Sequence, residues 1–309
     1  MYVFKSLENE SIKSLAATWN LAFSDYVVDM AMEPHRLEAY FMISGVDYSK
    51  SYGAYSGDEL VGMLMNSIDI YKGKTVAYDA MTGVVPAHRG KGLFSELFEY
   101  TRKTLRDSGV THYYLEVIQT NKRAYDIYSA KGGKVEREYT FLKGKAAGIK
   151  HNEKDGEDNI AKRKEACNTG VNVLSLSDFP AEEICTYEPS FSNRVSAMLR
   201  NAGDYQVAFI NSGERIGEHD ERAGRIQDSF SSFPAKAAAV FNTMGRITQV
   251  MYGGPEDKAG LGAIMSYLAR DFEELEISNI PSAETCLIND LRDIGFEVLV
   301  EQYEMSFVL

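Results

Sequence analysis

Residues 83–132 read GVVPAHRGKGLFSELFEYTRKTLRDSGVTHYYLEVIQTNKRAYDIYSAKG and carry the clearest pattern in the chain. The segment divides into a strand end, a turn, a helix, a second strand and a second helix. The extended apolar run over residues 75–85 stops at Pro86, as expected where a strand ends. After the turn, apolar residues recur at steps of three and four up to Gly109, which is typical of an amphipathic helix.

The turn over residues 88–92 has the composition of an anion-binding site. No carboxylate lies between Gly90 and Ser95, so the first N–H groups of the helix and its positive dipole end stay uncompensated. The glycines let a ligand approach the backbone, and Arg89 and Lys91 add two positive charges. This pattern predicts a pyrophosphate site.

Two common phosphate-binding loops do not match this turn. A P-loop has four residues between its first glycine and the Gly-Lys-Ser/Thr group, whereas six residues separate Gly83 from Gly90, and Gly92 stands where the hydroxyl is needed. A dinucleotide fingerprint needs a third small residue where Ser95 lies and an acidic residue at the end of the next strand. Glu116 is in the middle of that strand, so this second match is also poor.

The run over residues 84–93 resembles the acyl-CoA loop of the GNAT acyltransferase superfamily, whose signature is Gln/Arg-x-x-Gly-x-Gly/Ala. The second element of that signature matches as well. It reads Asn121-x-x-Ala124-x-x-x-Tyr128-x-x-x-Gly132 and has the family's spacing. The sequence departs at Ala87, where the family often has Gln or Arg, and at Gly133, where it often has Phe. Ala87 should cost little, because backbone N–H groups build most of the cradle.

The resemblance covers about residues 1–143 and implies the GNAT order of elements: strand, two helices, three strands, helix, strand, helix and strand. Residues 11–23 and 34–44 are the two predicted helices near the N-terminus, and residues 134–142 form the last predicted strand. By resemblance, the region between the two helices lines the acyl-acceptor site. The candidate substrate contacts there are Phe23, Asp25, Tyr26 and Tyr40. Helix packing with an exposed Asp explains these residues equally well.

The resemblance further implies acetyl-CoA as co-substrate. Its pyrophosphate would bind the turn, and its pantetheine amides would pair with the strand end before it, where a backbone N–H near Val84 or Val85 would polarise the thioester. The residues implied for this binding are Gly83, Val84, Val85, Arg89, Gly90, Lys91, Gly92, Leu93, Phe94 and Asn121.

Tyr128 stands at the family's general-acid position and would protonate the departing CoA thiolate. By spacing alone, a packed tyrosine is the better interpretation; with both motifs present, we favour acid catalysis. The base is less clear. Glu116 and Asp79 lie on neighbouring predicted strands, either could face away, Tyr78 takes the place of a carboxylate seen in some relatives, and a water chain could act instead. We retain Glu116.

With 309 residues, the chain is long enough for two domains. We predict a catalytic GNAT domain over residues 1–145, a polar linker over 146–170, and a second domain over 171–309 that weakly repeats the first. In this repeat, Leu291 replaces Tyr128, and residues 253–260 carry acidic residues and Pro where an anion would bind. The predicted fold class is α/β (α+β), with two GNAT-like domains, the second degenerate, each a mixed, mostly antiparallel sheet flanked by helices. The alternative is an unrelated α/β domain in the second half.

The formal net charge of −12 arises from residues 171–309, and no basic face indicates nucleic-acid binding. The acidity either attracts a cationic amine or, as we favour, keeps the protein soluble. No apolar run of transmembrane length and no signal segment are present, which predicts a cytoplasmic protein without membrane association. Three Cys and five His make a metal site improbable.

The sequence thus predicts an N-acetyltransferase that moves an acetyl group from acetyl-CoA to a primary amine of a small molecule or peptide by direct transfer in a ternary complex. The alternative is a sensor module that binds acyl-CoA or an amine without turnover, and acyl transfer to oxygen or sulfur also stays open. The protein is expected to be a monomer or homodimer.

Overall fold

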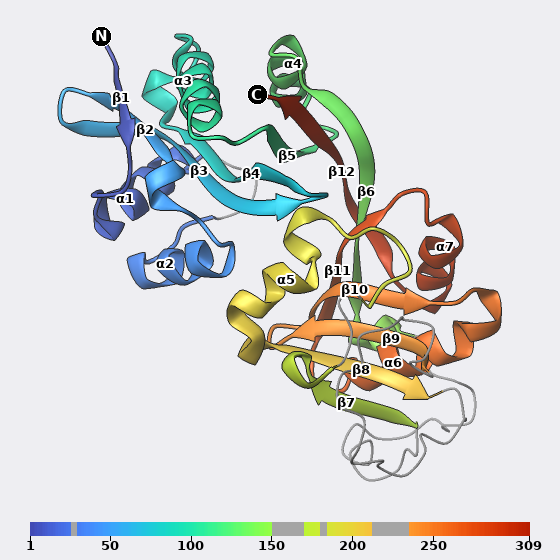
Figure 1. The fold of residues 1–309 in the computed structure, drawn as a ribbon. Helices are drawn as coiled ribbons and strands as arrows, with labels where there is room; N and C mark the ends of the chain where they lie inside the picture. Colours follow the sequence, from blue (N-terminus) through green and yellow to red (C-terminus); the bar gives the residue numbers. More distant parts are fainter. Residues whose placement is uncertain (26–29, 150–169, 180–183, 212–234) are drawn as a thin grey trace, which may run out of the picture. The chain divides into compact units, whose positions relative to one another are not determined.

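The computed structural model describes residues 1–25, 30–149, 170–179, 184–211 and 235–309 (Figure 1). The chain forms two compact units. Unit 1 consists of Met1–Arg137 and Gln302–Leu309, and unit 2 consists of Glu138–Glu301. Both are mixed α/β structures with a mostly antiparallel sheet, which confirms the predicted fold class. Among the helices of the described residues, none is long and apolar enough to span a bilayer.

Unit 1 follows the predicted element order up to its last strand. Its sheet has the strand order β1-β2-β3-β4-β5-β12, in which β4 and β5 pair in parallel and the other pairs are antiparallel. The elements are β1 (Val3–Ser6), α1 (Ile12–Ala22), α2 (Pro34–Ile43), β2 (Tyr52–Ser56), β3 (Glu59–Tyr71), β4 (Lys74–Val84), α3 (Leu93–Asp107), β5 (His112–Ile118), α4 (Lys122–Ala130) and the C-terminal part of β12 (Glu297–Val308).

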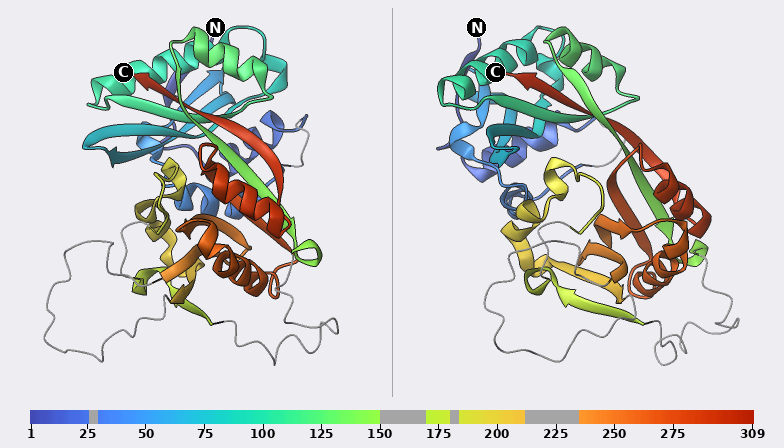
Figure 2. Two further views of the ribbon diagram at one scale, coloured as in Figure 1. Left: turned by 90° about the vertical axis from the view of Figure 1, so that its right-hand side faces the viewer. Right: turned by 45° about the vertical axis from the view of Figure 1, so that its right-hand side comes forward.

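The two faces of this sheet carry different helices (Figures 1 and 2). On one face, Leu15 and Trp19 of α1 and Phe41 of α2 pack against methionines of β3 and β4. On the other, Phe98 of α3 and Tyr128 of α4 pack on β5. Side chains of β5 alternate between the faces, as a strand requires: Tyr113, Leu115 and Val117 are buried under α3 and α4, and His112, Tyr114, Glu116 and Ile118 face the other way.

β4 contains a β-bulge near the point where β4 and β5 separate. In the pairing of β3 with β4, Asn66 lies opposite Asp79 and Met65 lies opposite Met81, so Ala80 is the extra residue. The parallel pairing of β4 with β5 ends at Tyr78 and Tyr114. Beyond these residues, the described strands are no longer paired to each other, and an opening forms in the sheet.

The last strand of each unit comes from a distant part of the chain. In unit 1, β12 pairs antiparallel with β5 over residues 302–308. In unit 2, β6 (Lys134–Lys145) pairs antiparallel with β11 (Glu274–Pro281) over residues 139–145. The sequence-based domain boundaries placed residues 138–145 in the first domain and residues 302–309 in the second, whereas the compact units assign them the other way round. The sequence of a strand does not by itself name its partner strand, so the sequence did not reveal this exchange.

Unit 2 repeats the architecture of unit 1. Its sheet has the order β6-β11-β10-β9-β8-β7, and β10 and β11 are its parallel pair. The helix α6 follows β10 and α7 follows β11, as α3 and α4 follow β4 and β5. The remaining elements are β7 (Val171–Ser175), α5 (Val195–Met198), β8 (Tyr205–Asn211), β9 (Ala235–Asn242), β10 (Arg246–Tyr252), α6 (Lys258–Leu268) and α7 (Thr285–Ile294). Most of the predicted linker lies outside the described residues.

Candidate active site

A cavity of about 690 Å³ lies in unit 1 where β4 and β5 separate. Side chains from both faces of the sheet line it. The cavity therefore extends from the N-terminus of α3 through the opening to the side of α1 and α2. The predicted site residues that line it are Phe23, Tyr40, Gly83, Val84, Arg89, Gly90, Gly92, Leu93, Phe94, Glu116, Asn121 and Tyr128. Asp25, Val85 and Lys91 are not among its lining residues, and Tyr26 lies outside the described residues.

The N-terminus of α3 has the backbone geometry of an anion cradle. Gly90 and Gly92 have φ angles of 75° and 81°, which residues other than glycine rarely adopt. Gly92 is the N-cap and has no side chain to cap the helix, and the first intrahelical bond runs from Glu96 N–H to Gly92 O at 3.1 Å. The N–H groups of residues 93–95 precede this bond and can therefore serve a ligand. The Glu96 carboxylate also lies in this first turn, one residue beyond the segment that the sequence analysis found free of acids.

The two predicted cations of this turn, Arg89 and Lys91, form hydrogen bonds within the protein. Arg89 donates from Nε to the carbonyl of Val84 at 2.8 Å and from Nη1 to the Asp25 carboxylate at 2.7 Å. This hydrogen bond lowers the pKa of Asp25. Arg89, predicted to bind acetyl-CoA, and Asp25, predicted to contact the acceptor, therefore form an ion pair with each other. Lys91 donates from Nζ to the carbonyl of Ala87 at 2.9 Å. Arg123, at the start of α4, lines the cavity and was not predicted.

The strand end before the turn offers one of the two predicted N–H groups. Val85 N–H donates to the Val61 carbonyl of β3 at 3.0 Å and is therefore occupied. Because successive N–H groups of a strand point to opposite sides, the N–H of Val84 points to the open edge, towards β5. Val84 is therefore the better placed of the two predicted donors.

Tyr128 lies on the α3 and α4 side of the opening, and 9% of its surface is exposed. Its ring packs edge-on against Phe94, with 5.5 Å between the ring centroids. Burial and the nearby Asp79 charge raise the pKa of Tyr128 above its ordinary value. The phenol therefore keeps its proton at neutral pH. Asn121 is the N-cap of α4 and accepts from Ala124 N–H at 3.2 Å, a structural role that the sequence analysis did not consider.

Asp79 and Thr82 join Tyr128 on this side. Asp79 was considered as a base but not retained, and Thr82 was not predicted. Asp79 follows Tyr78 directly, and the bulge that follows lets it share a face with Thr82. Thr82 donates to Asp79 Oδ2 at 2.6 Å. Burial raises the pKa of the Asp79 carboxyl to about 7, and this hydrogen bond partly offsets the rise.

Glu116 lies on the opposite side, the side of α1 and α2. Glu116 lines the cavity. Its direct neighbour on β12 is Glu304, which forms an ion pair with Arg137 at 2.8 Å. Burial and the Glu116 charge raise the pKa of Tyr78 well above its ordinary value, so Tyr78 stays neutral. The candidate acid Tyr128 and the candidate base Glu116 therefore face one cavity from the two sides of the sheet.

The space beside Gly133, where related sequences often have Phe, is filled by a residue from the other end of the chain. A Cβ added to Gly133 would lie 2.7 Å from the Phe307 ring. Phe307 belongs to β12 and packs edge-on against Phe98 and Tyr113, with centroid distances of 5.2 and 6.1 Å. The departure at Gly133 is thus compensated by β12.

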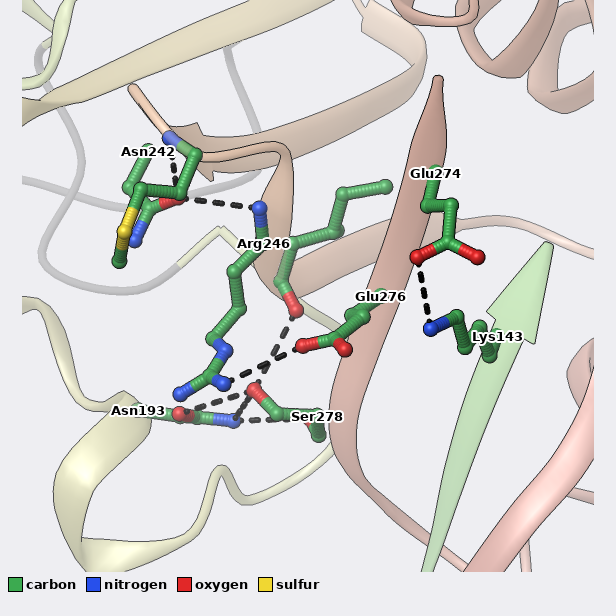
Figure 3. A network of polar contacts seen from close by, with 9 residues as sticks. Lys143, Asn193, Asn242, Arg246, Glu274, Glu276 and Ser278 are labelled. Atoms are coloured by element: carbon green, nitrogen blue, oxygen red, sulfur yellow. Dashed lines mark hydrogen bonds and ion pairs between the residues drawn. The ribbon is translucent and has the colours of Figure 1, made fainter. Parts of the chain in front are cut away.

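In unit 2, the chain itself fills the corresponding opening. The parallel pairing of β10 with β11 covers Arg246 and Ile247 only. Next to it, Gln249 Oε1 accepts from Ile184 N–H at 2.7 Å, and Gln249 Nε2 donates to the Asn193 carbonyl at 2.6 Å. Asn193 in turn donates from Nδ2 to the carbonyl of Ser278 at 2.8 Å, beside the ion pair of Arg246 with Glu276 (Figure 3).

The turn before α6 lacks the features of the cradle in unit 1. Its residues include Glu256 and Asp257, directly before α6 starts at Lys258. Lys258 forms ion pairs with Asp290 and Asp293, both at 2.7 Å. The acidic side chains at this helix start disfavour an anionic ligand.

Residues 15–132 match the family model described as the acetyltransferase (GNAT) family. They form a GNAT acetyltransferase domain. The match contains the cradle, Tyr128 and every residue that lines the cavity except Gln302. No curated protein matches the chain in sequence.

Solved structures resemble the whole chain in fold. A putative acetyltransferase from Pyrococcus horikoshii has a TM-score of 0.62 at 12% identity and covers 100% of this chain and 89% of its own. A tandem GNAT protein from the clavulanic acid biosynthesis pathway has a TM-score of 0.62 at 13% identity, covering 100% and 98%. A GCN5-related N-acetyltransferase from Sphaerobacter thermophilus has a TM-score of 0.60 at 13% identity, covering 99% and 95%. The fold of the chain is therefore that of GNAT proteins over its full length.

Proposed function

We propose that unit 1 is an acyl-CoA-dependent N-acetyltransferase that transfers the acetyl group of acetyl-CoA to a primary amine of a small molecule or peptide. The observation that carries the proposal is one continuous cavity: it begins at the glycine cradle, passes the open edge of β4, and is faced by Tyr128 and Glu116. Each part matches one part of the reaction.

Backbone groups would hold acetyl-CoA. The pyrophosphate would accept hydrogen bonds from the N–H groups of residues 93–95, with Arg123 as a nearby cation. The pantetheine amides would pair with the open edge of β4 as an added strand. The N–H of Val84 would donate to the thioester oxygen and stabilise the oxyanion as it forms.

Two side chains would move the protons. Glu116 accepts one proton from the substrate ammonium, and the neutral nitrogen attacks the acyl carbon. The C–N bond forms, the C–S bond breaks, and the CoA thiolate takes the proton of the Tyr128 phenol. The new amide nitrogen gives up its second proton, which restores the Tyr128 phenol through solvent, and Glu116 releases the first to solvent. Both substrates are bound together, so transfer is direct.

We also propose that unit 2 is a degenerate GNAT module without acetyl-CoA binding. The hydrogen bonds of Gln249 and Asn193 within its opening, together with the acidic start of α6, support this proposal.

The test is acetyl-CoA affinity measured by calorimetry, combined with free-thiol detection in the presence of amines. Wild type should bind one acetyl-CoA, and a Gly90→Glu, Gly92→Glu double variant should lose binding at least tenfold, because both carboxylates repel the pyrophosphate and both φ angles strain a side chain. Gly109→Glu is the matched control: it lies at the other end of α3, its φ is also positive, and an added Cβ meets nothing within 4 Å.

Absent binding by wild type would refute the acyltransferase proposal. Binding that persists in the double variant would move the cofactor site to unit 2. Binding without release of free thiol for any amine would favour the sensor function instead.

A further inference from the structure

The half of the cavity next to α1 and α2 is built from aromatic rings and methionines around one carboxylate. The rings come from α1, α2 and β4, and the carboxylate is that of Glu116 on β5. The apolar lining residues of this half, which we call the aromatic subsite, are Trp19, Phe23, Met30, Tyr40, Tyr78 and Met81.

Contacts within the protein hold the rings of the aromatic subsite in place. Trp19 is 2% exposed, donates from its indole nitrogen to the Met30 carbonyl, and lies 4.9 Å from Phe23 between ring centroids. Tyr40 packs edge-on against Trp19 and donates its hydroxyl to the carbonyl of Ala80, the bulge residue, at 3.1 Å. The subsite therefore exists before a ligand binds, which lowers the entropic cost of binding.

The described lining of the aromatic subsite offers no free cation. Of the basic residues that line the cavity, Arg123 belongs to the start of α4, and His88 lies at the turn, where its Nδ1 is 3.1 Å from the Tyr2 hydroxyl. Arg89 reaches the end of α1, but Asp25 and the Val84 carbonyl occupy its guanidinium.

This arrangement suits a cation with an apolar body. An ammonium group is attracted both by the Glu116 carboxylate and by the faces of aromatic rings. An apolar body would cover Phe23, Met30 and Met81 and would be removed from water. A carboxylate on the same molecule would meet Glu116 without a compensating cation in the described lining, and a second ammonium would have to leave water for an apolar wall.

We propose that the acyl acceptor is a primary amine on an apolar, preferably aromatic, body without a carboxylate or phosphate. The inference rests on the proposed function, since it names the substrate class of the same cavity. It excludes amino acids and linear polyamines as preferred substrates.

Three amines test the proposal with acetyl-CoA and free-thiol detection. L-Phenylalanine differs from 2-phenylethylamine by its carboxylate, and putrescine lacks the apolar body. We expect kcat/KM for 2-phenylethylamine to exceed both other values at least tenfold. Trp19 is the single Trp of the chain and lines the cavity, so its fluorescence reports amine binding without acetyl-CoA. 2-Phenylethylamine should change this fluorescence at concentrations at which the other two amines do not.

Phe23→Ala should raise KM for 2-phenylethylamine about tenfold and leave acetyl-CoA affinity unchanged, because Phe23 packs with Trp19 in the aromatic subsite and does not belong to the glycine cradle. Phe4→Ala is the matched control: Phe4 is a half-buried ring of unit 1 that packs on Tyr100 and does not line the cavity. Its KM should stay at the wild-type value.

Equal or better turnover of L-phenylalanine or putrescine would overturn the inference while leaving the acetyltransferase in place. Acetyl-CoA binding without turnover or fluorescence response for 2-phenylethylamine would also overturn it. Loss of acetyl-CoA binding altogether counts against the proposed function, and the fluorescence series still decides which amine the aromatic subsite takes.

Discussion

The Tyr128 hydroxyl can be removed with little change in packing, because Phe keeps the ring that contacts Phe94 and Phe98. Tyr128→Phe should therefore lower kcat by about 10²-fold or more, in line with the loss of a general acid, while acetyl-CoA affinity stays within about twofold. Tyr125→Phe is the control on the same helix, since Tyr125 packs against Tyr303 and does not line the cavity. Steady-state kinetics and calorimetry measure the two effects, and an unchanged kcat in Tyr128→Phe would remove the phenol from the mechanism.

Asp79 should make stability depend on pH. Burial raises its pKa from 3.8 to about 7, so between these values the folded state holds a proton that the unfolded state has lost. The contribution of this group to the free energy of unfolding therefore falls as pH rises from about 4 to about 7. Asp79→Asn should lose less stability than wild type between pH 5 and pH 8, measured by denaturant unfolding. Asp58→Asn, in an exposed turn, is the control, and identical pH slopes for wild type and Asp79→Asn would contradict the expectation.

Most of the site residues predicted from the sequence line the cavity, since the glycines of the turn and Tyr128 have fixed spacings. Asp79 was considered as a base beside Glu116, but its direction could not be predicted, because the face of a strand residue depends on the bulge at Ala80, which no spacing rule reveals. Nor could the sequence show that Arg89 and Asp25 bind each other, because such a pair joins residues far apart in the sequence. The assignment of Glu116 as base stays a prediction that its position beside the cavity supports.

The elements of unit 1 were predictable where a local signal marks both ends. The helix α1 starts after Ser11, whose hydroxyl accepts from Ser14 N–H at 3.1 Å, and α3 ends just before Gly109, whose φ is 88°. The pairing of β12 with β5 was not predictable, because strand partners are chosen by packing and not by local pattern. Gly133 gave an indirect indication. The GNAT pattern often has Phe at this position, between α4 and β6, and here the Phe307 ring of β12 lies beside it.

The exchanged strands predict that residues 1–145 do not form a stable GNAT domain by themselves. Without β12, the edge of β5 that faces β12 is left unpaired along residues 112–118, and Phe98 and Tyr113 lose their contact with Phe307. The fragment should be aggregated or should fail to bind acetyl-CoA by calorimetry. Residues 1–137 joined by a Gly-Ser linker to residues 297–309 supply both parts of unit 1 and should restore solubility and binding. A soluble, binding-competent fragment 1–145 would contradict this account.

The exchange of β6 and β12 also sets an order of events during synthesis. Residues 302–309 are synthesised after the whole of unit 2, yet they complete the sheet of the unit that is made first. At 5–20 residues per second, the ribosome spends on the order of ten seconds or more on the intervening residues 138–301. During that time β5 has no neighbour on one side and is exposed to other nascent chains. A stop codon before residue 302 would therefore leave unit 1 without its last strand, although every residue of its family signature had already been translated.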